Sequence, residues 1–137
     1  MLKVLIADDH VIVRRGLRDI LREASEEAII GEASNGQEAL SKALAEDWDV
    51  VILDITMPIL TGLMVLKALK QERPNLPVLM LSMYSSQQYV LSSLKAGASG
   101  YLNKETAPEE LLQAIRTLLA GGRYVSKTLA ANLELNL

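Results

Sequence analysis

The residues of this sequence that could do chemistry are acidic side chains placed where short apolar segments end. Asp8 and Asp9 follow the segment Lys3–Ala7, and Asp54 follows the segment Val50–Leu53. Carboxylates held together repel one another, by about 4 kcal/mol for two charges ~4 Å apart at an effective dielectric near 20. A hard divalent cation removes that cost, and Mg²⁺ prefers oxygen ligands. The three acids therefore indicate a magnesium site.

A hydroxyl and an amine follow two further apolar segments. Ser82 follows Val78–Leu81, and Lys104 comes shortly after Gly100–Leu102. A lysine ammonium suits a phosphoryl oxygen, and a serine hydroxyl can donate a hydrogen bond to one. Together with the acids and a cation, they predict a phosphoryl-transfer site in which a carboxylate is the candidate nucleophile. Because the chain has no cysteine and a single histidine, the sequence disfavours zinc or a softer metal.

Each of these residues has an ordinary structural explanation when it is taken alone. Asp8 or Asp9 could equally be the N-cap of a following helix. Ser82 could be a loop hydroxyl and Lys104 a solvated surface lysine. His10, the only histidine, is interpreted as a helix-start residue or a local hydrogen-bonding residue. It is the whole set, each member placed just after its own strand-like segment, that favours a functional site.

The segments that must position these residues alternate between strand-like and helix-like patterns. The spacing predicts strands over Lys3–Ala7, Ile29–Ala33, Val50–Leu53, Val78–Leu81 and Gly100–Leu102, and helices over Val11–Ala24, Gly36–Glu46, Gly62–Arg73, Ser86–Ala96 and Pro108–Ala120. Such alternation is typical of βαβ units and of a parallel sheet covered on both faces. We therefore predict an α/β fold with a doubly wound, five-stranded parallel sheet. Ligands of such sheets bind outside the carboxyl ends of the strands, which would bring the candidate residues together.

Length and composition agree with one compact domain. The chain has 137 residues, of which 50% are hydrophobic, and a formal net charge of −3. The mildly acidic balance disfavours nucleic acid as a partner of this chain itself. Since no apolar run approaches the ~20 residues that span a bilayer, we expect a cytoplasmic domain with no membrane partner.

The sequence resembles the receiver domain of two-component response regulators over residues 1–122. The matching motifs are Asp8-Asp9-His10, Asp54-Ile55-Thr56-Met57-Pro58 with Gly62, Leu81-Ser82, and Gly100-Tyr101-Leu102-Asn103-Lys104. The resemblance implies a flavodoxin-like, CheY-like (βα)5 fold with strand order 2-1-3-4-5. It also implies a phosphoacceptor that takes its phosphoryl group from a sensor histidine kinase. Such a domain catalyses its own phosphotransfer and autodephosphorylation and is not an enzyme with a separate substrate.

The resemblance implies a role for each residue of the acidic set. Asp54 would be the phosphoacceptor. Asp9 would be the main carboxylate ligand of Mg²⁺, Asp54 a second ligand, and Asp8 would assist directly or through water. The backbone carbonyl of Thr56 would complete the share of the coordination that the protein supplies.

The resemblance also implies a phosphoryl-binding pair and a conformational switch. Ser82 and Lys104 would bind the phosphoryl oxygens. Movement of the Ser82 hydroxyl towards those oxygens would let the aromatic ring of Tyr101 turn inward, which would change the surface around the fourth helix and the fifth strand. The alternative for Tyr101 is a half-buried strand aromatic with no switching role.

The motifs around the predicted sheet resemble those of the NarL/FixJ group of response regulators. They are Asp-Asp-His at the first strand, Ser-Met-Tyr after the fourth strand and Gly-Gly-Arg-Tyr-Val-Ser at 121–126. In that group a linker and a LuxR-type helix-turn-helix domain follow the receiver. Residues 123–137 are too few for a DNA-reading domain. We interpret them as a linker segment, helical near Thr128–Leu135, that leads to a DNA-binding output domain absent from this chain. We also expect a homodimer to form on phosphorylation.

Three other interpretations compete with this one. The chain could be a stand-alone regulator with no output domain. A phosphatase of the haloacid-dehalogenase type also uses an aspartate nucleophile and Mg²⁺, but it needs a second acid two residues later, where this chain has Thr56. A flavodoxin-like nucleotide-binding module would need a glycine-rich phosphate loop after the first strand, where this chain has two acids.

Many receivers carry proline, with a cis bond, after the lysine that corresponds to Lys104. Glu105 stands there, and the sequence leaves that bond open.

Overall fold

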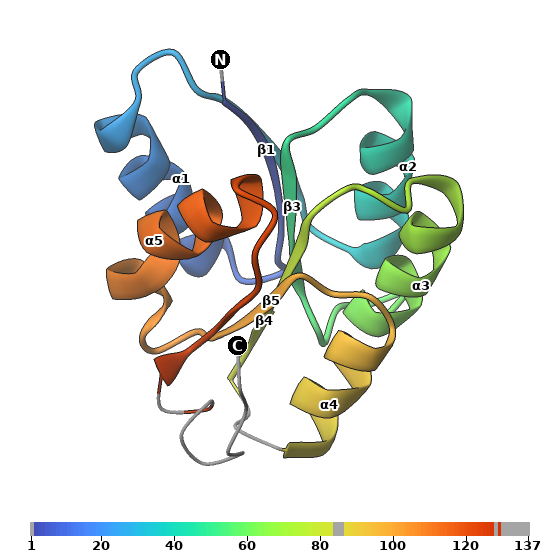
Figure 1. The fold of residues 1–137 in the computed structure, drawn as a ribbon. Coiled ribbons are helices and arrows are strands. Elements are labelled where there is room, and N and C mark those ends of the chain that lie inside the picture. Colours follow the sequence, from blue (N-terminus) through green and yellow to red (C-terminus); the bar gives the residue numbers. More distant parts are fainter. Residues whose placement is uncertain (1, 84–86, 128, 130–137) are drawn as a thin grey trace.

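The structure is a computed structural model, and it describes residues 2–83, 87–127 and 129. Five helices surround one parallel sheet (Figure 1). The strands are β1 (Lys3–Ala7), β2 (Ile29–Ala33), β3 (Val50–Asp54), β4 (Val78–Ser82), β5 (Gly100–Asn103) and β6 (Tyr124–Val125). The helices are α1 (Val11–Ala24), α2 (Gly36–Ala45), α3 (Gly62–Glu72), α4 (Gln87–Lys95) and α5 (Ala107–Leu119).

The sheet has the order β2-β1-β3-β4-β5-β6, which confirms the predicted α/β class and the order 2-1-3-4-5. The predicted number of five strands is one too few. Tyr124–Val125, which we assigned to a linker, pairs in parallel with β5 as a short sixth strand. Two residues are too short a run to show the periodicity by which strands are recognised. The helix predicted near Thr128–Leu135 lies outside the described residues, apart from Leu129.

The boundaries of most elements differ by a single residue from those predicted. Strand β3 extends to include Asp54 and strand β4 to include Ser82. Helix α3 ends at Glu72, before the proline at position 74. The predicted start of α4, Ser86, lies outside the described residues, and the helix is described from Gln87. These shifts matter for the site, since they place two candidate residues at the last position of a strand.

The central strands are apolar throughout because helices cover both of their faces. Every residue of β3 and of β4 is buried. Helices α1 and α5 lie on one face of the sheet, and α2, α3 and α4 on the other (Figure 1). Alternate residues of each strand therefore point into two separate cores, and neither face has room for a polar stripe.

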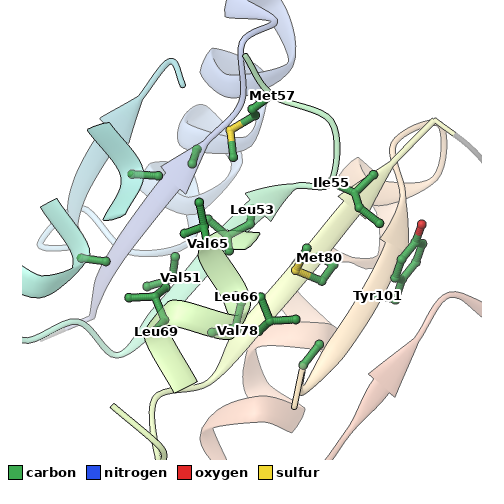
Figure 2. Close-up of a cluster of buried hydrophobic side chains, with 14 of the residues drawn as sticks. Val51, Leu53, Ile55, Met57, Val65, Leu66, Leu69, Val78, Met80 and Tyr101 are labelled. Atoms are coloured by element: carbon green, nitrogen blue, oxygen red, sulfur yellow. The ribbon is translucent and has the colours of Figure 1, made fainter. Parts of the chain in front are cut away.

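The larger core lies between the sheet and helices α2, α3 and α4. Figure 2 shows Val51 and Leu53 of β3 beside Val65 and Leu69 of α3. All four side chains have no exposed surface. Burial of one such side chain contributes about 1.5–3 kcal/mol relative to leaving it exposed. This packing holds β3 rigidly, and with β3 the aspartate at its end.

Candidate phosphorylation site

The candidate residues gather at the carboxyl ends of three strands of the sheet, β1, β3 and β5. Asp8 directly follows β1, Asp54 is the last residue of β3, and Lys104 directly follows β5. Their exposed fractions are 0%, 1% and 8%. Since charged side chains are almost never fully buried unless they are paired, this burial points to mutual contacts. The predicted convergence of these strand ends is confirmed.

The ammonium of Lys104 joins the two buried carboxylates. Its Nζ lies 2.8 Å from Oδ2 of Asp8 and 3.0 Å from Oδ2 of Asp54. The ammonium therefore compensates part of the repulsion between two buried acids. Removing it would leave both charges uncompensated, which typically costs several kcal/mol for a buried pair.

Burial raises the pKa of Asp54 to about 6, the nearby charge of Asp8 adds to the rise, and Lys104 opposes it. The backbone N–H of Thr56 donates a hydrogen bond of 3.2 Å to the Oδ1 atom of Asp54, which also favours the charged form. Asp54 is thus ionised but poorly solvated near pH 7. A carboxylate in that state is held ready for an electrophile or a cation.

His10, not either aspartate, is the N-cap residue of α1. Its backbone N–H donates to Oδ1 of Asp8 over 2.8 Å. The structure therefore confirms His10 as a helix-start residue and removes the explanation of Asp8 or Asp9 as the N-cap. Asp9 is partly exposed, with 36% of its side chain accessible. Its Oδ1 atom lies 3.4 Å from Nδ1 of His10. A partly exposed carboxylate beside two buried ones is suited to bind a ligand.

The imidazole of His10 also belongs to the site, which the sequence did not predict. Its Nδ1 atom lies 3.0 Å from Oδ1 of Asp8 and 3.0 Å from Nζ of Lys104. The position of His10 directly after two acids could have indicated that its ring joins the site. That position, however, fits a ring turned outward equally well. Only the path of the chain into α1 brings the ring over the carboxylates.

A pocket of about 460 Å³ opens above these groups. It is lined by Asp9, His10, Asp54, Thr56, Met57, Pro58, Met83 and Lys104. Four of the predicted site residues thus share one cavity, while Asp8 lies beneath it and supports Lys104. The mixture of a cation, carboxylates and methionine side chains suits a small charged group more than an apolar ligand.

The pocket has the donor atoms that Mg²⁺ requires. One carboxylate oxygen each from Asp8, Asp9 and Asp54, together with a ring nitrogen of His10, lie within 4.8 Å of one another. Carboxylate oxygens are the ligands that Mg²⁺ prefers, and the open pocket leaves room for the waters that it retains. The residues present therefore fit the cation that the sequence predicts.

Ser82 and Tyr101 lie below the pocket and are fully buried. Burial raises the pKa of the Tyr101 phenol, while the neighbouring Ser82 hydroxyl lowers it and the charge of Asp54 adds a smaller rise. Tyr101 therefore occupies an inward position, and the alternative of a half-buried strand aromatic is wrong because the side chain has no exposed surface. Figure 2 shows its ring on β5, next to Met80 of β4.

Comparison with known proteins decides the family. The response regulator receiver domain model matches residues 4–116. The chain is 34% identical over 136 residues to response regulator UvrY of Escherichia coli K12, covering 99% of this chain and 62% of UvrY. It is 36% identical over 135 residues to response regulator GacA of Pseudomonas syringae, covering 98% of this chain and 63% of GacA. The chain belongs to the response regulator receiver domain family.

Solved structures agree with this assignment. A two-component response regulator of the LuxR family from Aurantimonas superposes with a TM-score of 0.90 at 32% identity, over 96% of this chain and 94% of that one. The isolated receiver domain of RcsB from Salmonella enterica, solved with a phosphomimetic, gives 0.86 at 27% identity, over 96% and 98%. These relatives place this receiver domain in the NarL/FixJ subclass.

The receiver domain spans about three-fifths of the length of the curated relatives it matches. Members of its family accept a phosphoryl group and are not conventional enzymes. Across the described part of the chain, no helix combines the length and apolar character that a bilayer span requires. Every peptide bond described is trans, including the bond between Lys104 and Glu105.

Proposed function

We propose that Asp54 is the phosphoacceptor of this receiver domain. The observation that carries the proposal is the buried Lys104 ammonium, which contacts the Asp54 carboxylate at the floor of an open polar pocket. A nucleophile, a cation for the phosphoryl oxygens and space for the group itself then occur together. The rise in the pKa of Asp54 to about 6 still leaves the carboxylate mostly ionised at pH 7.

The chemistry is a transfer between two side chains. A carboxylate oxygen of Asp54 attacks the phosphorus of a phosphohistidine on a sensor kinase. The phosphorus–nitrogen bond breaks as the phosphorus–oxygen bond forms, and the departing imidazole keeps the electron pair and takes up a proton. Lys104 and the hydroxyl of Ser82 then bind the phosphoryl oxygens. Attack of water on the acyl phosphate in the same pocket would return the free carboxylate, as autodephosphorylation.

The proposed cofactor is Mg²⁺. Asp9 and Asp54 would be its carboxylate ligands, with Asp8 assisting and the backbone carbonyl of Thr56 completing the set. When bound, the cation neutralises the charge of the transferring phosphoryl group. The protein's own share is the rigid placement of the acids at two strand ends and of Thr56 on the loop after β3.

The proposed switch couples Asp54 to Tyr101 through Ser82. A phosphoryl group adds about −1.5 to −2 charge and strong acceptor oxygens, towards which the Ser82 hydroxyl would be drawn. The ring of Tyr101, which the resemblance implies turns inward, is already buried. The Ser82 movement would therefore hold the ring in this inward position and favour the matching arrangement of the surface formed by α4 and β5.

The partners of the whole protein follow from the family and stay proposals. We infer a sensor histidine kinase as the phosphodonor, an output domain with a DNA-binding helix-turn-helix, and a homodimer formed on phosphorylation. The proposed division is a receiver over residues 1–122 and a connecting segment over 123–137, in a cytoplasmic transcription regulator.

The test is intact-mass measurement after treatment with acetyl phosphate and Mg²⁺. Wild type should gain one phosphoryl group, and should not gain it in EDTA. Asp54→Asn should gain none, because an amide is not a nucleophile for this transfer. Asp47→Asn, at a fully exposed position far from the pocket, is the matched control and should behave as wild type. A phosphoryl gain on the Asp54 variant would contradict the assignment.

A further inference from the structure

The segment that follows α5 is bonded to the strand that leads into Lys104. Tyr124 pairs with Gly100 and Val125 with Tyr101. The backbone N–H of Ser126 donates to the carbonyl of Tyr101 over 2.9 Å. We call residues 124–127 the strap. In Figure 1 it is the short strand at the red end of the chain. The strap therefore covers the outer edge of β5, the strand that leads into Lys104.

One contact of the strap is made by the side chain of Ser126. The backbone N–H of Asn103 donates to Oγ of Ser126 over 3.0 Å, and Ser126 is fully buried. Asn103 directly precedes Lys104, whose own N–H donates to the carbonyl of Ser82 over 2.9 Å. The N–H groups of these two successive residues thus form hydrogen bonds on opposite sides of the chain. That of Lys104 bonds to β4, and that of Asn103 bonds to the strap.

Other contacts fix the strap without touching that turn. The hydroxyl of Tyr124 donates to Oε2 of Glu110 on α5 over 2.6 Å. Val125 is buried in the same core cluster as Tyr101. These contacts hold the strap against α5 and the core, so that Ser126 has a rigid base from which to act on Asn103.

The close approach of the strap depends on a glycine in β5. A Cβ atom at Gly100 would lie 2.5 Å from the carbonyl oxygen of Tyr124, closer than real Cβ contacts allow. The absence of a side chain at this position therefore lets the strap pair with β5 through main-chain hydrogen bonds. A larger residue would hold the strap and β5 apart.

We propose that Ser126 is a positioning residue for Lys104, and that the strap couples the phosphorylation pocket to the chain that follows it. The inference rests on the proposed function, since it requires Lys104 to act on a phosphoryl group bound to Asp54. Ser126 touches neither group and acts through Asn103. Because coupling between binding equilibria is reciprocal, a phosphoryl analogue that binds at Lys104 should in turn stabilise the strap.

The first test compares two variants that each remove one side-chain hydrogen bond from the strap. Ser126→Ala should lower the initial rate of phosphorylation by acetyl phosphate by roughly 3- to 10-fold, the range that loss of one hydrogen bond gives. Backbone amide exchange at Asn103 and Lys104 should be faster in this variant. Tyr124→Phe, the matched control, should keep the wild-type rate, because its lost bond leads to α5. The apparent Mg²⁺ affinity should be unchanged in both.

The second test uses the wild-type chain and reads the coupling in the opposite direction. Adding beryllofluoride with Mg²⁺ should slow amide exchange at Ser126, whose N–H donates to Tyr101. Three results would each overturn the proposal. They are an equal phosphorylation rate in Ser126→Ala and wild type, an equal slowing of that rate in Ser126→Ala and Tyr124→Phe, and an unchanged amide exchange rate at Ser126.

If wild type gains no phosphoryl group, the proposed function fails and this inference fails with it. A gain in wild type at a rate that Ser126→Ala matches overturns this inference alone.

Discussion

At the scale of single residues, the site holds more negative charge than its own cation compensates. Three carboxylates and one lysine meet there, and two of the carboxylates are buried with that lysine. The same excess that suits the pocket to a cation should make the metal-free protein less stable than it could be. Function and stability are therefore opposed at Asp54.

Asp54→Asn should consequently stabilise the metal-free protein, by about 1 kcal/mol after screening. An amide keeps the shape of the side chain and removes one buried charge. Urea unfolding in EDTA at pH 7.5 measures the effect as a higher midpoint. A midpoint equal to or below that of wild type would contradict the account of repulsion in the pocket.

The stability difference between these two proteins should depend on pH in a defined direction. The pKa of Asp54 is raised in the folded state from 3.8 to about 6, so the fold disfavours its ionised form. The penalty is absent below about pH 4 and complete above about pH 6. The advantage of Asp54→Asn should thus shrink as pH falls from 6 to 4. An advantage that grows on acidification would show the opposite sign.

At the scale of elements, the start of α3 packs against the end of β3 that carries Asp54. The N–H of Gly62 donates to the carbonyl of Ile55 over 2.9 Å. A Cβ atom at Gly62 would overlap the carbonyl of Asp54 itself. The helix can begin this close to Asp54 only because its first residue has no side chain.

Gly62→Ala should therefore destabilise the protein by about 1–3 kcal/mol, the usual cost of overpacking. It should also slow phosphorylation, because the clash displaces the backbone of Asp54. Gly16→Ala is the matched control: Gly16 is exposed within α1, and nothing lies within 4 Å of a Cβ there. That variant should gain up to about 1 kcal/mol from helix propensity. Thermal unfolding and phosphorylation rates measure both, and equal effects of the two substitutions would contradict the packing argument.

At the scale of the whole molecule, a ligand that binds only the folded state stabilises all of it. The acids come from the loop after β1 and from the end of β3, and they can meet only when the sheet is assembled. Cation binding is therefore linked to folding of the entire domain.

Mg²⁺ should raise the Tm of wild type in a concentration-dependent way, and EDTA should reverse the rise. Asp9→Asn should lose most of this response, because the exposed carboxylate is the proposed main ligand. Glu27→Gln removes the same charge at an exposed position outside the pocket and should keep the wild-type response. Differential scanning calorimetry gives the shifts, and a full response in Asp9→Asn would remove that residue from the ligand set.

The class of fold and most of the residues of the site could be predicted from the amino-acid pattern alone. Hydrophobic periodicity reports which face of a segment is buried, and an unbroken apolar run such as Val50–Leu53 already indicates a central parallel strand. Since parallel strands end at a common edge, Asp8, Asp54 and Lys104 could be brought together before any coordinates existed.

How those residues contact one another could not be predicted in the same way. Three features depend on distances between segments that are far apart in the chain. They are the bridge from Lys104 to two buried carboxylates, the turn of the His10 ring over them, and the burial of Tyr101. The sequence predicts a linker over the strap because its pairing with β5 leaves no trace in the local pattern. Two residues have no measurable period, and their strand character comes from the neighbour with which they pair. Local patterns encode burial, whereas contacts across the sheet are set by how the helices and strands pack.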